Sequence, residues 1–247
     1  MQLSERMRRL TGLVTEGNRL ADVGTDHGYV PIALVKAGRI PSAVAMDVNR
    51  GPLARARAHI RESGLSTYIE TRLSDGLAQL EPGEAETVMI AGMGGMLTIR
   101  ILENGAHCLD TVQELVLQPQ SDIRRVREWL RNHGRLTTAE DIVEEDGKYY
   151  PMLKAVRGRE RPLTEADLCY GKAEVQRSPE TLRRYLQAGL AENRKILETL
   201  RAHGRAGTDR GLQVAEQIDR LTAVLAETVR PDVGGAVKGG CSYNEMQ

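Results

Sequence analysis

The chain has 247 residues, 40% of them hydrophobic and 28% charged, which is typical of a soluble globular protein. Lysine plus arginine equals aspartate plus glutamate at 34 each, so the net charge gives no general attraction to nucleic acid, and any RNA affinity must come from local clusters. With no Phe and one Trp, extensive base-stacking platforms are not expected. Because the three cysteines lack metal-ligand spacing and the N-terminus lacks a hydrophobic signal core, we predict a cytoplasmic protein without a metal site or membrane association.

The first predicted element is a helix over residues 3–13, where apolar side chains recur at helical spacing and Ser4 stands in the capping position. Its arginines, Arg6, Arg8 and Arg9, are expected to point outward. They are either contacts for RNA phosphates or, more commonly in proteins, part of a solvated helix face.

The stretch from Arg19 to Pro31 has the pattern of a buried strand that passes through a loop into a helix. Asp22 stands at the end of the strand, and Gly24 and Gly28 follow in a G-x-x-x-G spacing that lets the backbone approach a ligand. The spacing matches neither a dinucleotide motif nor a P-loop, which favours a ligand held without a phosphate group. S-adenosyl-L-methionine (SAM) meets that condition, with its ammonium group facing Asp22; a purely structural turn is the alternative.

The second buried strand, residues 43–46, ends at Asp47, about twenty residues after Gly24. At that distance from a glycine loop, a carboxylate is positioned for the two hydroxyls of a ribose. Asp47 could instead cap the following helix, a role for which Asn49 competes.

The next two strands, residues 67–73 and 87–91, are also followed by candidate ligand contacts. After the first, Asp75 beside Gly76 can bind an exocyclic amine such as that of adenine, or can form a simple turn. After the second, three glycines within residues 92–95 predict that a substrate or cofactor lies close to the backbone. Helices are predicted between the strands at residues 30–38, 52–63, 96–105 and 122–133.

A fifth strand over residues 114–118 precedes the helix that carries the densest group of arginines, for which phosphate contact and ordinary exposure are equally plausible. Beyond it, residues 136–144 and 148–156 flank Asp146-Gly147, a strong hairpin dipeptide. Five strands alternating with helices, followed by an antiparallel hairpin, predict the α/β, Rossmann-like sheet of class I methyltransferases.

The C-terminal third is polar and helix-prone. Residues 179–203 and 210–229 each place leucine, isoleucine or valine along one stripe, which predicts an antiparallel coiled-coil hairpin. We therefore expect a catalytic domain over residues 1–160, a helical coiled-coil domain over 161–230 and a disordered tail over 231–247.

Four segments, taken in order, resemble the bacterial tRNA (adenine-22-N1)-methyltransferase family. They are Asp22–Pro31, Ala91–Gly95, Leu115–Gln120 with Arg127–Leu130, and Glu144–Tyr150. The resemblance covers roughly residues 3–157 and implies a Rossmann-like catalytic domain with a C-terminal coiled coil. It implies transfer of a methyl group from SAM, leaving S-adenosyl-L-homocysteine, to N1 of an adenine in the D-loop region of tRNA.

Carried over by position, the resemblance also implies site residues. The SAM contacts would be Asp22, Gly24, Asp26 and His27 at the methionine moiety, Asp47 at the ribose, Asp75 and Gly76 at the adenine, and Ala91 and Gly92 beside them. For the reaction itself, our hypothesis is that the flipped adenine is oriented by Asp26, His27, Tyr29, Met93 and Gly94. Candidate RNA contacts are Arg6, Arg9, Arg124, Arg127, Arg131, Arg183 and Arg184. We expect a monomer that needs no obligate protein partner.

Three other functions stay open at this stage. A methyltransferase acting on a small molecule or a protein would keep the SAM loop but would not need the arginine clusters. A catalytically inert RNA-binding module would bind tRNA regardless of SAM. An NAD-linked enzyme would bind its cofactor through Asp47.

Overall fold

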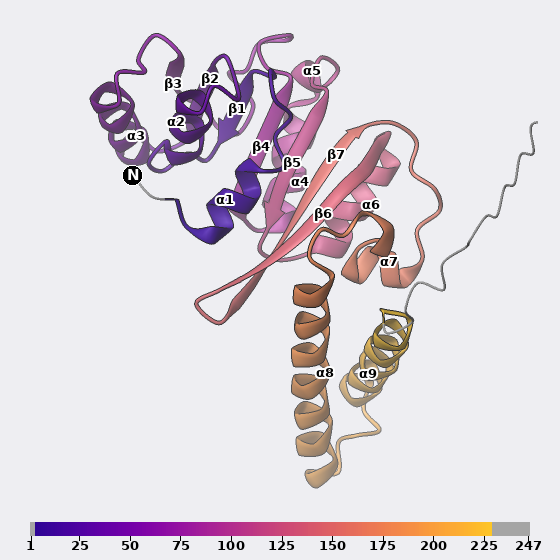
Figure 1. Ribbon diagram of the computed structural model, residues 1–247. Helices are drawn as coiled ribbons and strands as arrows, with labels where there is room; N and C mark the ends of the chain where they lie inside the picture. The colour runs from indigo at the N-terminus through magenta and orange to yellow at the C-terminus, as the bar shows by residue number, and fades with distance from the viewer. Residues whose placement is uncertain (1–2, 229–247) are drawn as a thin grey trace, which may run out of the picture. The chain divides into compact units, whose positions relative to one another are not determined.

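The computed structural model describes residues 3–228 (Figure 1), so the predicted tail, 231–247, lies outside the described residues. The chain divides into two compact units, residues 1–185 and 186–247, which we describe separately. In the part of the chain that is described, no helix combines the length and hydrophobicity needed to cross a bilayer. Residues 161–185 belong to the first unit, so the structural division lies after residue 185. The functional boundary expected at residue 160 stays a prediction.

The described residues of the first unit contain a seven-stranded sheet in the order β3-β2-β1-β4-β5-β7-β6. Its strands are β1 (Leu20–Val23), β2 (Ala43–Asp47), β3 (Ile69–Leu73), β4 (Thr87–Met93), β5 (Glu114–Pro119), β6 (Arg135–Glu145) and β7 (Lys148–Arg157). The first five strands are parallel, whereas β7 pairs antiparallel with both β5 and β6. The predicted Rossmann-like sheet with a terminal antiparallel hairpin is confirmed.

Helices cover both faces of this sheet (Figure 1). They are α1 (Glu5–Thr11), α2 (Tyr29–Lys36), α3 (Arg50–Glu62), α4 (Gly95–Asn104), α5 (Ala106–Leu109), α6 (Ile123–Asn132) and α7 (Glu165–Tyr170), with a 3-10 turn η1 (Ala173–Val175). One apolar cluster joins α1, α2 and α3 to the sheet, and a second joins α4, α5 and α6 to the opposite face.

Strand alternation decides which face carries the candidate site. Along β1, Leu20 belongs to the cluster under α1–α3, whereas Ala21 and Val23 belong to the cluster on the other face. Since successive side chains of a strand point to opposite faces, Asp22 points toward α1–α3. The same alternation along β5 places Val116 and Gln118 on this face.

Residues 74–86, between β3 and β4, form turns, which is one of the two roles that the sequence leaves open for Asp75 and Gly76. The hydroxyl of Ser74 donates to the carbonyl of Gly76 and accepts from the N–H of Gln79, and Gly76 and Gly83 both have positive φ angles. Side-chain bonds and left-handed glycines fix these turns, so no helix connects β3 to β4.

The second unit consists, within its described residues, of the later part of α8 (Pro179–Ala202) and of α9 (Asp209–Thr228). Leu186, Leu197, Val214 and Leu221 are buried, and an added Cβ at Gly189 would meet the side chain of Leu221. The predicted apolar stripes therefore pack against each other within one chain, which confirms the helical hairpin.

Candidate functional site

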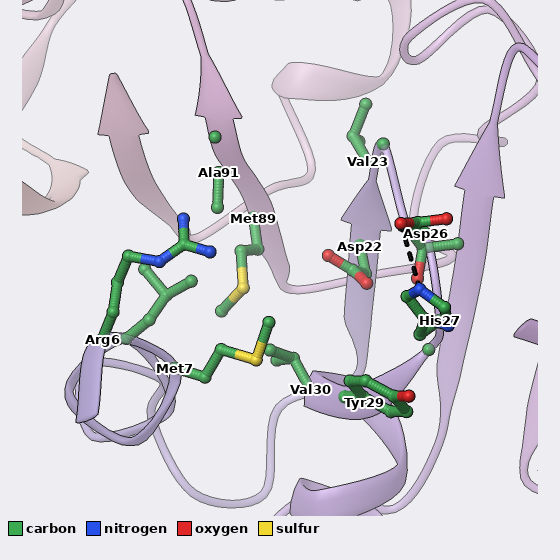
Figure 2. Close-up of a pocket in the computed structure, with 15 residues that line it drawn as sticks. Arg6, Met7, Asp22, Val23, Asp26, His27, Tyr29, Val30, Met89 and Ala91 are labelled. Atoms are coloured by element: carbon green, nitrogen blue, oxygen red, sulfur yellow. Dashed lines mark ion pairs between the residues drawn. The ribbon is translucent and has the colours of Figure 1, made fainter. Parts of the chain in front are cut away.

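A cavity of about 250 Å³ opens at the carboxyl ends of β1 and β4, on the face covered by α1 and α2 (Figure 2). Its lining residues come from three places in the chain. They are Arg6, Met7 and Leu10 of α1; Asp22, Val23, Gly24, Thr25, Asp26, His27, Gly28, Tyr29 and Val30 of the loop and its flanks; and Met89, Ala91 and Gly92 of β4. Most of the loop that follows β1, which the sequence predicts to bind a ligand, therefore lines this cavity at the edge of the sheet.

Asp22 supplies a buried negative charge at this cavity. The residue is only 8% exposed, and burial raises its pKa to about 6, with the carboxylate of Asp47 acting in the same direction. A buried carboxylate with a raised pKa is stabilised by any cation that enters beside it. The site therefore fits a ligand that carries a positive charge at this end, such as the ammonium group of SAM.

The loop after Asp22 is held by backbone bonds. The N–H groups of Gly24 and Thr25 both donate to the carbonyl of Met46, at 2.8 and 2.9 Å, so these two donors bind the neighbouring strand rather than a ligand. Gly24 has a φ of +80°, and an added Cβ would collide with the end of the Met93 side chain. Glycine is required here because the loop turns in the left-handed region under a close neighbour.

Three aromatic rings form a compact cluster beside the cavity. The ring centroids of His27, Tyr29 and His59 lie 4.9–5.4 Å from one another, and His27 and Tyr29 line the cavity. A ring nitrogen of His59 lies 3.0 Å from the carbonyl of His27, and His27 Nε2 lies 3.2 Å from the carboxylate of Asp26. Arg55 also pairs with Asp26. These contacts hold His27 and Asp26 in the loop, while His27 Nδ1 is buried without a hydrogen-bond partner.

The glycines at the end of β4 and directly after it have different structural roles, which the sequence alone does not distinguish. Gly92 has a φ of +76° and lines the cavity at a bulge in β4. At Gly95 an added Cβ would lie 2.3 Å from the carbonyl oxygen of Ser121. Close packing against the chain after β5, and not a ligand, therefore explains Gly95.

We expect Gly95→Ala to destabilise the protein by about 1–3 kcal/mol, because the methyl group forces α4 away from Ser121. Urea unfolding followed by circular dichroism measures the change. Gly51→Ala is the matched control, since Gly51 also lies in the first turn of a helix without a positive φ angle, and the nearest atom to an added Cβ there is 3.9 Å away. A stability loss no larger for Gly95→Ala than for this control would contradict the packing argument.

The residues predicted at the nucleoside half of SAM lie outside the cavity. Asp47 Oδ1 accepts the N–H of Asn49 at 2.6 Å, at the end of β2. Asp75 is exposed after β3, and Gly76 has a φ of +58° with its Cα against Ile101. Because β1, β2 and β3 are adjacent and parallel, these carboxylates follow Asp22 along the same edge of the sheet.

Met93 and Gly94 are also absent from the cavity lining, although Asp26, His27 and Tyr29 share its wall. The end of the Met93 side chain instead lies over Gly24, and Gly94 packs near the hydroxyl of Ser121. Of the five residues that we expect to orient the acceptor adenine, the structure thus places three on one wall of the cavity.

Arg6 corrects the expectation that the α1 arginines point outward. It lines the cavity (Figure 2). Its Nη1 donates to Gln118 Oε1 at 3.0 Å, and its guanidinium lies 5.1 Å from the ring centre of Tyr150. Gln118 Oε1 also accepts the N–H of Gly92. Neither the role of Arg6 in the wall nor that of Gln118 follows from the sequence, because these two residues are 112 positions apart.

Arg127 corrects a second expectation. It is 4% exposed, and its Nη2 lies 2.5 Å from the carboxylate of Glu140, which is equally buried. Its Nη1 donates to the carbonyl of Leu168. An arginine enclosed by these partners does not reach an RNA phosphate, because α6 turns this side chain toward β6 and α7.

The other candidate RNA contacts lie closer to the surface, and several have protein partners. Arg9 pairs with Glu5 and Asp141, Arg124 with Glu128 and Glu165, Arg131 with Asn132, and Arg184 with Glu144. Arg183 is exposed on α8. Among residues 3–228, no group of three or more His, Cys, Asp or Glu side chains is placed to hold a metal ion.

A Rossmann-like sheet with an antiparallel terminal hairpin, and a buried acid beside a glycine turn at the end of β1, defines the class I methyltransferase architecture. The family model of the methyltransferase domain matches residues 3–153. The chain is 37% identical over 158 residues to the tRNA (adenine(22)-N(1))-methyltransferase of Bacillus subtilis, a match that covers 64% of this chain and 66% of that protein.

Two solved structures extend the similarity. A candidate tRNA (m1A22) methyltransferase of Streptococcus pneumoniae, in complex with S-adenosyl-L-methionine, has 34% identity and a TM-score of 0.81, with 91% of this chain and all of that chain covered. The B. subtilis m1A22 tRNA methyltransferase TrmK has 29% identity and a TM-score of 0.76, with coverage of 91% and 99%. The chain belongs to the SAM-dependent tRNA (adenine-22-N1)-methyltransferase family.

Proposed function

We propose that this chain transfers a methyl group from SAM to N1 of adenine 22 in the D-loop region of tRNA. The observation that carries the SAM half is the buried carboxylate of Asp22 in a cavity at the ends of β1 and β4. The acceptor half is supported by the named relatives, whose chains this protein matches nearly end to end in structure.

When bound, SAM supplies an electrophilic methyl group on a sulfonium. Adenine N1 has a lone pair in the neutral base, so the new N–C bond forms as the C–S bond breaks, and its electron pair stays on the sulfur of the S-adenosyl-L-homocysteine product. No proton has to leave N1 and no general base is required. The chain's own contribution is therefore binding and positioning.

For that contribution we assign Asp22, Gly24, Asp26 and His27 to the methionine end of SAM, with Ala91 and Gly92 beside it. Asp47 takes the ribose, and Asp75 with Gly76 takes the adenine of SAM. His59 and Arg55 of α3 hold the loop, which supports a positioning role for His27 and Asp26. The proposed tRNA contacts are Arg6, Arg9, Arg124, Arg131, Arg183 and Arg184, without the enclosed Arg127. We propose that the protein is a cytoplasmic monomer.

The proposal is tested by incubating the protein with labelled SAM and unmodified tRNA, then identifying the methylated nucleoside after digestion. We expect 1-methyladenosine from tRNA with adenine at position 22 and none from the same tRNA with another base there. SAM affinity is measured in parallel by calorimetry. SAM binding without 1-methyladenosine would show that the donor site is assigned correctly and the acceptor wrongly, and would favour a small-molecule or protein substrate.

A further inference from the structure

A second cavity, of about 410 Å³, lies within the first compact unit and has no role in the SAM site described above. Its lining combines three aromatic rings, one amide and one ammonium group: Gln120, Gly147, Lys148, Tyr149, Tyr150 and Tyr185. The sequence has seven tyrosines in all, so nearly half of them meet at this one place. A chain poor in aromatic residues has concentrated them where β6 and β7 turn and where β5 ends.

The two cavities are neighbours through the wall formed by Gly92 and Arg6. An added Cβ at Gly92 would lie 3.9 Å from both Arg6 Nη1 and Gln120 Nε2. Arg6 and Gly92 line the first cavity, Gln120 lines the second, and the guanidinium of Arg6 lies over the ring of Tyr150, which also lines the second. The N–H of Gln120 donates to the carbonyl of Met93 at 2.8 Å, which fixes this residue to the end of β4.

The strand order determines the side from which a methyl acceptor approaches. In the proposed function, the nucleoside half of SAM extends from β1 over β2 and β3, through Asp47 and Asp75. The opposite side, over β4, β5 and the β6–β7 hairpin, is the side left for the acceptor. The second cavity lies on this side.

The chemistry of the lining fits a purine. Aromatic rings stack on unpaired bases, and Tyr149 and Tyr185 lie 5.4 Å apart at a tilt of 58°. Burial raises the pKa of Tyr185 above its ordinary value, which is consistent with a ring held among apolar neighbours. A glutamine amide matches the N6 and N7 edge of adenine, accepting from N6–H and donating to N7. This pairing leaves N1 free, as methylation of N1 requires.

We propose that this cavity, formed by Gln120 with Tyr149, Tyr150 and Tyr185, receives the acceptor adenine, and that Gln120 selects adenine through its N6 and N7 atoms. The inference rests on the proposed function and names the acceptor subsite for it. Lys148, exposed at the rim, is placed for a neighbouring phosphate.

The sharpest test replaces one atom of the substrate, the N7 nitrogen of the acceptor adenine, by a C–H group. Wild-type protein and Gln120→Ala are compared on tRNA carrying either adenine or 7-deazaadenine at position 22, the latter lacking the N7 acceptor. We expect the 7-deaza substitution to lower kcat/KM of the wild type about tenfold or more and to change that of Gln120→Ala less than threefold, because the partner amide is already missing. Gln120 is exposed, so the SAM affinity of the variant should stay within twofold of the wild-type value.

Stacking is tested with Tyr149→Ala, expected to lower kcat/KM for tRNA at least tenfold, and Tyr149→Phe, which keeps the ring and should restore it. Tyr68→Ala is the matched control: Tyr68 is 53% exposed and does not line this cavity. Equal losses for Tyr149→Ala and Tyr149→Phe would overturn stacking. Equal kcat/KM of the wild type on adenine and 7-deazaadenine would overturn the Gln120 contact alone, whereas no 1-methyladenosine from wild-type protein that binds SAM would overturn the proposed function and the subsite together.

Discussion

Asp22→Asn is expected to weaken SAM binding by roughly tenfold to a hundredfold. This range corresponds to about 1.5–3 kcal/mol, which is typical of a hydrogen bond to a charged group. The substitution keeps the shape of the side chain and removes only its charge, so the loss reports the pairing of the buried carboxylate with the SAM ammonium. Titration calorimetry with SAM gives the dissociation constants. An unchanged dissociation constant would remove Asp22 from the proposed SAM contacts.

The same substitution should stabilise the ligand-free protein. Folding raises the pKa of Asp22 from 3.8 to about 6, so between these pH values the folded chain holds a proton that the unfolded chain has released. The destabilisation caused by the buried carboxylate therefore grows as pH rises through this window and is complete above about pH 6. The advantage of Asp22→Asn should be negligible near pH 4 and reach up to about 3 kcal/mol at pH 7.

SAM binding, in contrast, should become stronger as pH rises through the same window. Below about pH 6 the ammonium group has to displace the proton of Asp22, so the dissociation constant of the wild type should rise by up to about tenfold per pH unit. Asp22→Asn keeps every other ionisable group and is therefore the control for their effects on binding. The same pH dependence in both proteins would assign the effect to another group.

Arg127→Ala is expected to destabilise the protein by about 3–5 kcal/mol, because it leaves the carboxylate of Glu140 buried without its partner. In a protein of this size that corresponds to a melting temperature lower by roughly 10 °C. Arg131→Ala is the matched control on the same helix: Arg131 is half-buried, and its only side-chain bonds in the described residues go to Asn132, so its loss should change stability by less than about 0.5 kcal/mol.

The double variant Arg127→Met/Glu140→Leu separates the ion pair from its packing. Replacing both partners by apolar groups should recover most of the stability lost in Arg127→Ala, since no buried charge remains unpaired. A folded Arg127→Ala protein of wild-type stability with reduced tRNA affinity would instead return Arg127 to the RNA-binding surface.

Local patterns were sufficient to predict the architecture. Apolar runs at strand spacing, glycines at helix ends and the Asp146-Gly147 hairpin predicted every strand of the sheet, because backbone preference and burial act over a few residues. They also left a turn open after β3, where the hydroxyl of Ser74 bonds to the backbone of Gly76 and Gln79. The short helices α5 and α7 were missed because four to six residues carry little periodicity.

The loop from Asp22 to Tyr29 was predicted to bind a ligand from the sequence alone, because an acid followed by spaced glycines at a strand end is typical of such loops, and the structure places this loop on the wall of a cavity. Only the tertiary structure decided that Asp22 is buried with a raised pKa, that Arg6 turns inward to Gln118, and that Arg127 is enclosed by Glu140. Arg6 and Gln118 are 112 positions apart, and β6 and α7 come after α6 in the chain, so no local pattern records these contacts. The sequence determined which segments form the strands and the loop; the sheet order and strand alternation decided which charges are buried and which side chains meet.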